Sequence, residues 1–133
     1  MKLAWLIAIL GTLCACNPSE NVVIDSGRVC VEPEAVAAHE ASADLVLTVR
    51  LDECISACAR DTEASCDARL DGDEIVVHSE GHWSDSNETC IAVCASLEAE
   101  CVLEDVAPGE YTVRHGEESW PLVLPSEIEG ECL

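Results

Sequence analysis

Hydrophobic and polar residues alternate most clearly over residues 44–52, which read Asp-Leu-Val-Leu-Thr-Val-Arg-Leu-Asp. In an extended chain, successive side chains point to opposite faces. One face of this segment is therefore wholly apolar, formed by Leu45, Leu47, Val49 and Leu51. The alternation predicts a strand with one buried face.

Further along the chain, two segments flank a tight turn. Residues 66–70 and 74–78 lie on either side of Asp71-Gly72-Asp73. Because glycine accepts the positive φ that a tight turn requires, this pattern predicts a β-hairpin. Similar segments at 101–106 and 110–114 are joined by Ala107-Pro108-Gly109, where Pro followed by Gly fits the centre of a type II turn.

The remaining segments carry weaker patterns. Residues 28–33 end in proline and residues 120–124 contain one, which predicts edge strands because proline cannot donate to a neighbouring strand. Residues 34–43 are rich in alanine and predict a helical turn or a loop. Residues 17–26 are polar without a clear period and predict a tether.

Cysteine spacing indicates a duplication. Residues 54–66 have the spacing C-x3-C-x7-C and residues 90–101 have C-x3-C-x6-C, at an offset of 36 residues, and each triplet precedes two strand-like segments. The second triplet also fits helical spacing, so short helical turns at the triplets are an alternative. The predicted fold is mainly β: a small, disulfide-rich antiparallel β-sandwich of about seven strands, built on this duplicated Cys-triplet and hairpin unit.

The segment Pro108-Gly109-Glu110-Tyr111-Thr112-Val113 resembles a strand entry of immunoglobulin-like and transthyretin-like sandwiches of secreted bacterial proteins. The resemblance covers about a dozen residues around a turn of this kind and implies a fold rather than a function.

The N-terminus carries an export pattern. A single basic residue precedes an apolar run, residues 3–13, that is too short to span a membrane and is typical of a signal peptide. It ends in Leu13-Cys14-Ala15-Cys16, which resembles the lipobox of bacterial lipoproteins, although Cys14 stands where that motif usually has another small residue. The expected division is a signal peptide at 1–15, a lipidated N-terminus and tether at 16–27, and the β-sandwich domain at 28–133.

This resemblance implies that Cys16 is acylated and that the lipid bilayer is a partner of the protein. Two or more acyl chains hold a protein durably on a membrane. Asn17, in place of an aspartate, favours the outer membrane in the sorting pattern that the motif resembles. The alternative is an ordinary signal peptide cut after Ala15, without lipid.

Ten cysteines, less Cys14 and Cys16, leave eight, which predicts four disulfides in an exported domain. Spacing does not decide among the 105 pairings that eight cysteines allow. If the two copies are related by symmetry and bridged locally, the preferred scheme is Cys30–Cys132, Cys54–Cys90, Cys58–Cys66 and Cys94–Cys101. A shifted scheme instead contains Cys54–Cys66, Cys90–Cys101 and Cys58–Cys94.

Charge narrows the classes of partner. Without the signal peptide the chain has five arginines against 27 acidic residues, a net charge of −22. Such a surface repels nucleic acid and anionic headgroups. It would steer a basic protein electrostatically, or it serves solubility alone.

Candidate chemistry is sparse. His78 and His82 lie four residues apart and are candidate metal ligands, since imidazole suits zinc and copper, with two solvated histidines as the alternative. The chain contains no nucleophile-elbow, phosphate-loop or nucleotide motif, so we expect neither a cofactor nor catalytic residues. The expected function is a non-catalytic, membrane-anchored envelope binding or structural module. The alternatives are an acidic inhibitor of a basic, lysozyme-like hydrolase and a metal-binding envelope protein.

Overall fold

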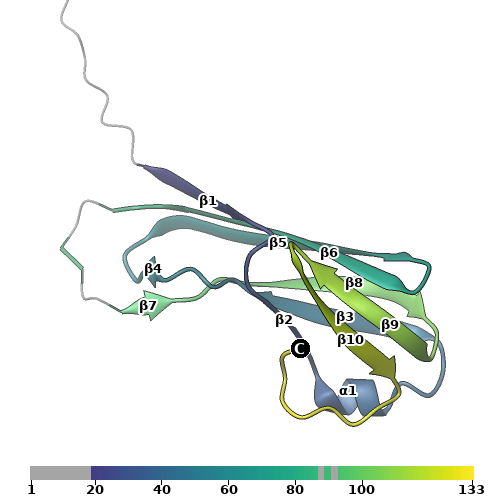
Figure 1. Cartoon of the computed structure of the whole chain (residues 1–133). Coiled ribbons are helices and arrows are strands. Elements are labelled where there is room, and N and C mark those ends of the chain that lie inside the picture. The colour runs from purple at the N-terminus through teal and green to yellow at the C-terminus, as the bar shows by residue number, and fades with distance from the viewer. Residues whose placement is uncertain (1–18, 87–88, 91–92) are drawn as a thin grey trace, which may run out of the picture.

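A computed structural model describes residues 19–86, 89–90 and 93–133. Ten strands and one helix lie in these residues, in the order shown in Figure 1. They are β1 (Glu20–Ile24), β2 (Arg28–Val31), α1 (Pro33–Ala37), β3 (Ala43–Arg50), β4 (Ile55–Ser56), β5 (Arg60–Asp71), β6 (Glu74–Ser84), β7 (Cys94–Ala95), β8 (Glu98–Val106), β9 (Gly109–His115) and β10 (Glu118–Leu124).

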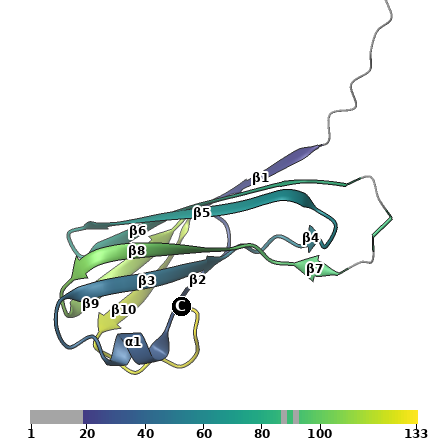
Figure 2. The same ribbon diagram turned by 180° about the vertical axis from the view of Figure 1, so that it is seen from behind.

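The strands form two layers, which confirms the predicted β-sandwich. Sheet A contains β5, β6, β1, β9 and β10, and sheet B contains β2, β3 and β8. The short strands β4 and β7 form a third, two-stranded sheet at one end of the sandwich, as Figures 1 and 2 show from opposite sides. Ten strand segments replace the expected seven, and the described residues of the Cys triplets contain short strands rather than helical turns.

The long strand β6 organises sheet A. One of its edges pairs along its length with β5, in the hairpin predicted around Gly72. Its other edge is shared, because β9 pairs in parallel with Glu74–Val77 and β1 pairs antiparallel with the part of β6 that follows. The pairing of β6 with β9 is the exception to the predicted antiparallel arrangement.

Two local predictions are wrong. Residues 20–24 belong to the expected tether but form β1, because β6 extends beyond β9 and offers them a pairing edge. The second copy does not form a hairpin, because β8 lies in sheet B and β9 in sheet A. Gly109 accordingly begins β9 and is absent from the described residues with positive φ, so the type II turn does not form.

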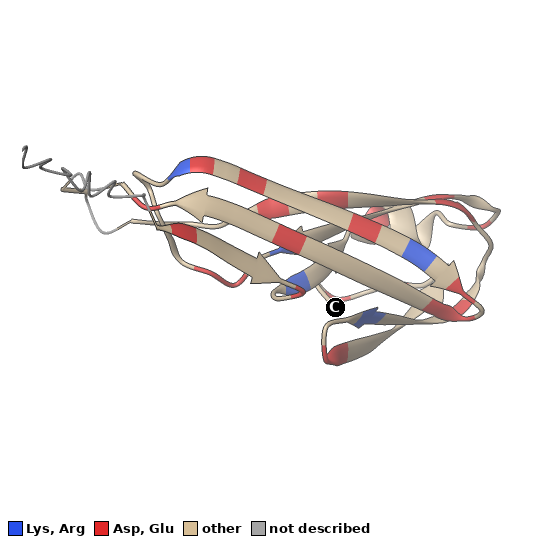
Figure 3. Cartoon of the chain, turned by 90° about the horizontal axis from the view of Figure 1, so that it is seen from above, with Lys and Arg blue, Asp and Glu red and all other residues tan. Residues whose placement is uncertain are grey.

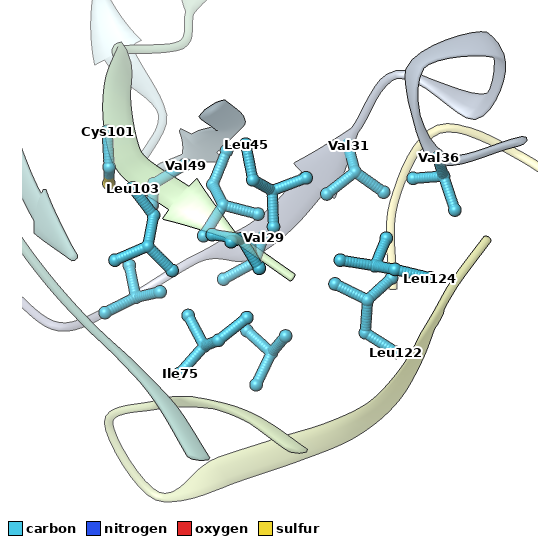
Figure 4. Packing of buried hydrophobic residues seen from close by; sticks show 14 of the residues in the cluster. Val29, Val31, Val36, Leu45, Val49, Ile75, Cys101, Leu103, Leu122 and Leu124 are labelled. Atoms are coloured by element: carbon cyan, nitrogen blue, oxygen red, sulfur yellow. The ribbon is translucent and has the colours of Figure 1, made fainter. Parts of the chain in front are cut away.

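The core lies between the two sheets. The predicted alternation of β3 is confirmed, with Leu45, Leu47 and Val49 at most 2% exposed. Opposite them lie Ile75 of β6 and apolar residues of β9 and β10 (Figure 4). Helix α1 closes one end, where Val36 lies beside Leu124. Each buried side chain of this size contributes about 1.5–3 kcal/mol.

Four disulfides brace this core, and one is the predicted pair Cys30–Cys132, with Cα atoms 3.8 Å apart. The C-terminal residues 131–133 hydrogen-bond to β2 around this bridge. The tail therefore covers the outer edge of sheet B.

The other three predicted pairs are wrong, and so is the shifted scheme. The observed pairs are Cys54–Cys94, Cys58–Cys90 and Cys66–Cys101, with Cα separations of 4.8, 6.0 and 5.1 Å. Every one of them joins the first copy of the triplet to the second.

Strand geometry explains why the local bridges fail. The predicted bridge Cys58–Cys66 is an example. Strand β5 begins at Arg60, two residues after Cys58, and its extended chain carries Cys66 about 20 Å away from Arg60, whereas a disulfide needs Cα atoms within about 7 Å. The crosswise pairing follows from the antiparallel arrangement of β4 and β7. In such a pair, the first cysteine of one copy lies near the second cysteine of the other.

Candidate functional site

Strand β6 presents a row of polar side chains on the outer face of sheet A. Its residues alternate, so that Val77 and Ser79 point inward and are buried while His78, Glu80 and His82 point outward. The sequence shows this period only up to residue 78. The polar composition beyond that point conceals the rest of the strand.

The register of the neighbouring strands completes this face. On β5, Glu63 lies opposite His82 and Asp67 lies opposite His78. On β1, Val22 lies opposite His82, and Ile24 lies opposite Glu80. We call this set the β1 face: Val22, Ile24, Glu63, Ser65, Asp67, His78, Glu80 and His82. Figure 3 looks onto β5 and β6 and shows their acidic residues spread along both strands.

His82 lies between two carboxylates, those of Glu20 and Glu80. Its Nε2 atom contacts Oε1 of Glu80, and its Nδ1 atom lies 3.9 Å from Oε1 of Glu20. A hollow of about 480 Å³ opens beside it, lined by Glu20, Asp61, Thr62, Glu63, His82, Trp83 and Ser84. An irregularity in β5 shapes one wall, where Asp61 has a φ of 52° and the register with β6 shifts.

His78 is held by a different carboxylate. Its Nδ1 atom lies 3.3 Å from Oδ2 of Asp25, and the backbone N–H of Ser79 donates to Oδ1 of the same residue at 2.9 Å. Burial alone would raise the pKa of Asp25. The hydrogen bonds from Ser79 and His78, together with the positive charge of His78 and His115, outweigh burial and lower that pKa below its usual value.

His78 and His82 do not form the metal site that their spacing suggested. Four residues of a strand span about 13 Å, so the two rings share a face but are too far apart to bind one ion. Each contacts its own carboxylate instead. Within the described residues, no three His, Cys, Asp or Glu side chains are grouped to hold a metal.

A buried polar cluster lies directly behind this face, and sequence reasoning missed it. Oγ of Ser79 lies 2.8 Å from Nε2 of His115, and Nδ1 of His115 lies 3.2 Å from the carbonyl oxygen of Gly27. If Nδ1 carries the proton it donates to Gly27, and Ser79 then donates to Nε2. Ser79 is 4% and His115 is 2% exposed, so the pair joins β6, β9 and the β1–β2 connection in the interior. No motif marks these residues, because they lie far apart in the sequence.

The predicted lipidation site, Cys16, lies outside the described residues, as do the signal peptide and Asn17. In the described part of the chain, no helix is long and apolar enough to cross a bilayer.

Comparison with known proteins gives no relative. No protein-family model matches the sequence, and neither a curated protein nor a solved structure matches it.

Proposed function

We propose that this chain is a lipid-anchored, exported binding module that holds a rigid acidic surface close to a bilayer and recognises a cationic protein without catalysing a reaction. The single observation that carries the recognition part is the β1 face. Its three carboxylates, Glu63, Asp67 and Glu80, lie on two paired strands of one rigid sheet. Clustered charge of one sign raises the association rate of a partner of opposite sign.

The anchoring part rests on the lipobox-like Leu13-Cys14-Ala15-Cys16 and on where the described fold begins. The carbonyl oxygen of Ser19, the first residue that the structure describes, accepts a hydrogen bond from the N–H of Asp85. Three residues of chain reach at most about 11 Å. An acyl group on Cys16 would therefore keep β1 near the membrane surface.

Labelled palmitate tests the anchor. The full-length precursor, expressed in a bacterial host with lipoprotein processing, is expected to incorporate the label, and Cys16→Ser is expected to abolish both incorporation and membrane fractionation. Cys14→Ser is the matched control and should keep the label. An unlabelled wild-type protein in the soluble fraction would contradict the anchor.

Binding to basic proteins tests recognition. The soluble domain, produced without residues 1–18, is expected to retain cationic hydrolases at low salt and to release them as salt rises, because screening weakens exposed charge pairs. Binding that is absent at low salt, or indifferent to salt, would contradict the proposal.

A second candidate function, inhibition of a basic lysozyme-like hydrolase, is favoured by the net charge of −21. It predicts that the domain lowers the hydrolase's activity on cell walls with the same salt dependence as binding. Binding without inhibition would leave the module function and remove the inhibitor.

A further inference from the structure

Strand β1 has one edge that no described strand covers. Strand β1 lies at the margin of sheet A, beside the part of β6 that β9 leaves unpaired, and β6 is its one partner among the described strands. The backbone N–H of Asp25 donates to the carbonyl oxygen of Ser79 at 2.9 Å. At the other end of the strand, the N–H of Asp85 donates to the carbonyl oxygen of Ser19 at 3.3 Å. These bonds bracket the strand and show that its odd-numbered residues point their backbone groups toward β6.

The even-numbered residues therefore point their backbone groups away from β6. In an antiparallel ladder, successive residues alternate between the two edges. Glu20, Val22 and Ile24 thus offer their N–H and C=O groups to the free edge. Val22 and Ile24 are also 51% and 64% exposed, among the most exposed large hydrophobic side chains in the described structure.

The other outer strands carry features that hinder the addition of a strand. Residues 131–133 hydrogen-bond to β2, and Pro121 interrupts the donors of β10. Strands β5 and β8, joined through their inner faces by the disulfide between Cys66 and Cys101, each carry four acidic residues, and charged side chains of this kind discourage strand addition. No residue in the described part of the chain covers the outer edge of β1.

Charge decides which kind of strand this edge fits. Ile24 lies beside Glu80, and the next strand adds Glu63 and Asp67. An added strand would lie two strand spacings, about 10 Å, from β6, so a lysine or arginine on its outer face could reach across β1 toward Glu80. Glu63 and Asp67, one strand further away, add to the negative field. Apolar side chains on the same face of the added strand would cover Val22 and Ile24. A second copy of this chain, which also carries a net charge of −21, would be repelled.

We infer that β1 is an acceptor edge on which an extended segment of a partner protein, with basic and apolar side chains together on one face, adds to sheet A as a further strand. This inference rests on the proposed function, because it specifies how the cationic partner is held. Backbone hydrogen bonds to Glu20, Val22 and Ile24 would supply affinity, and the neighbouring carboxylates would supply selectivity.

A short synthetic peptide tests the inference on the domain without residues 1–18. Every second residue of the peptide is in turn lysine and valine, with threonine between them, so that lysine and valine share one face; we call it the lysine–valine peptide. Two comparison peptides keep the threonines: one has serine in place of each valine, and the other has glutamate in place of each lysine. We expect the lysine–valine peptide to bind most tightly and to slow amide hydrogen exchange at Glu20, Val22 and Ile24. Protection of β5 or β8 instead would overturn the inference.

Two variants of β1 separate the backbone from the side chains. Val22→Pro removes an N–H that faces the free edge and leaves the hydrogen bonds to β6 in place. The double variant Val22→Ser, Ile24→Ser removes the apolar contact. Each is expected to raise the peptide Kd about tenfold or more.

The matched control for the side chains is Val46→Ser, Val102→Ser on the outer face of sheet B. These valines are cross-strand neighbours with 46% and 54% exposure, so the same apolar surface is lost far from β1. The control should bind the peptide as the wild type does. Far-UV circular dichroism and a thermal melt of every variant show that the fold is retained. A Val22→Pro variant that folds and binds like the wild type would overturn the inference.

Two double variants test the contribution of charge. The first, Glu63→Gln with Glu80→Gln, neutralises carboxylates of the β1 face, and the control, Glu100→Gln with Glu104→Gln, neutralises two on β8. Only the first pair should weaken binding of the lysine–valine peptide and reduce its salt dependence. Equal weakening by both pairs would show that overall charge, and not this face, holds the peptide.

The outcomes separate this inference from the proposed function. Salt-sensitive capture of basic proteins that is unchanged by Val22→Pro would leave the proposed function standing and overturn the acceptor edge. A wild-type dimer that Val22→Pro dissociates would identify a second copy as the occupant and would also overturn it. Absence of both protein and peptide binding would remove both.

Discussion

Cys66 and Cys101 occupy the same position in the two copies of the cysteine triplet, and they are bonded to each other with Cα atoms 5.1 Å apart. The other two bridges exchange partners between the copies, Cys54 with Cys94 and Cys58 with Cys90. This is the pairing expected of two units related by an approximate twofold axis. The duplication is therefore expressed in the disulfides, even though the second copy divides its strands between the two sheets.

Removal of the Cys66–Cys101 bridge should be costly. Replacing both cysteines by serine opens a loop of 35 residues, which corresponds to about 4 kcal/mol of unfolding free energy. It also places a hydroxyl where the disulfide sulfur of Cys101, a residue 2% exposed, now lies in the core. Urea unfolding of the oxidised protein measures the loss.

The bridge Cys58–Cys90 provides the control for that experiment. It closes a loop of similar length, 32 residues, but lies within the loop already closed by Cys54–Cys94. Its removal should cost about 1 kcal/mol, since the remaining bridge still restricts the unfolded chain. An equal loss from both double variants would contradict the order of importance that we assign.

Ser79→Ala should destabilise the fold because it leaves Nε2 of buried His115 without its partner at 2.8 Å. An unsatisfied buried polar group costs about 1–3 kcal/mol. Ser65→Ala, at an exposed position of β5, is the control and should change the unfolding free energy by no more than about 0.5 kcal/mol. Chemical denaturation at neutral pH compares the two variants. A Ser79→Ala variant as stable as Ser65→Ala would contradict the stabilising role that we assign to the Ser79–His115 hydrogen bond.

Asp25 gives the stability of the protein a predictable dependence on pH. Its folded-state pKa is lowered, so the ionised carboxylate stabilises the fold at neutral pH. That contribution is lost as the pH falls from about 4, the value of the unfolded chain, through the lower folded-state pKa. Asp25→Asn should therefore be less stable than the wild type at neutral pH, and the difference should shrink in acid.

Denaturation series at several pH values test this expectation. Asp73→Asn, at the β5–β6 turn, changes the overall charge by the same amount and serves as the control. A difference between wild type and Asp25→Asn that grows in acid would have the wrong sign for a carboxylate with a lowered pKa.

Gly27→Ala should disrupt the passage of the chain from sheet A to sheet B. Gly27 has a φ of 116°, and a Cβ atom there would lie 2.2 Å from the carbonyl oxygen of Arg50. Backbone atoms do not move aside cheaply, so we expect a loss of about 3 kcal/mol or more. Gly72→Ala, with a φ of 67° and open space around it, should cost only about 1–2 kcal/mol. Thermal melts of both variants rank the two sites.

The strands that can be predicted directly from the sequence are those that pack one face against the core. Alternation predicts β3, and the glycine between two apolar segments predicts the β5–β6 hairpin, because both signals lie within a few residues of each other. The pair Cys30–Cys132 is also predicted, as the two cysteines outside the triplets, although Cys30 lies in the second strand and Cys132 in the tail after β10.

Long-range relationships required the tertiary structure. Strand β1 is recognisable only from its partner, because a polar segment becomes a strand where β6 extends past β9 and leaves an edge unpaired. The same holds for Ser79 and His115, which meet through the parallel pairing of two strands.

The sequence by itself determined that the fold is mainly β, that its cysteines form disulfides, and that the chain is acidic and carries an export-like pattern, because these properties depend on composition and on short-range periodicity. Only the tertiary structure decided that the cysteine triplets bond to each other, that His78 and His82 are too far apart to share a metal ion, and that β1, paired with the strand that carries Glu80, has an edge that no described strand covers. The physical reason is that each of these depends on the register and direction of strands distant in sequence, which no local pattern encodes.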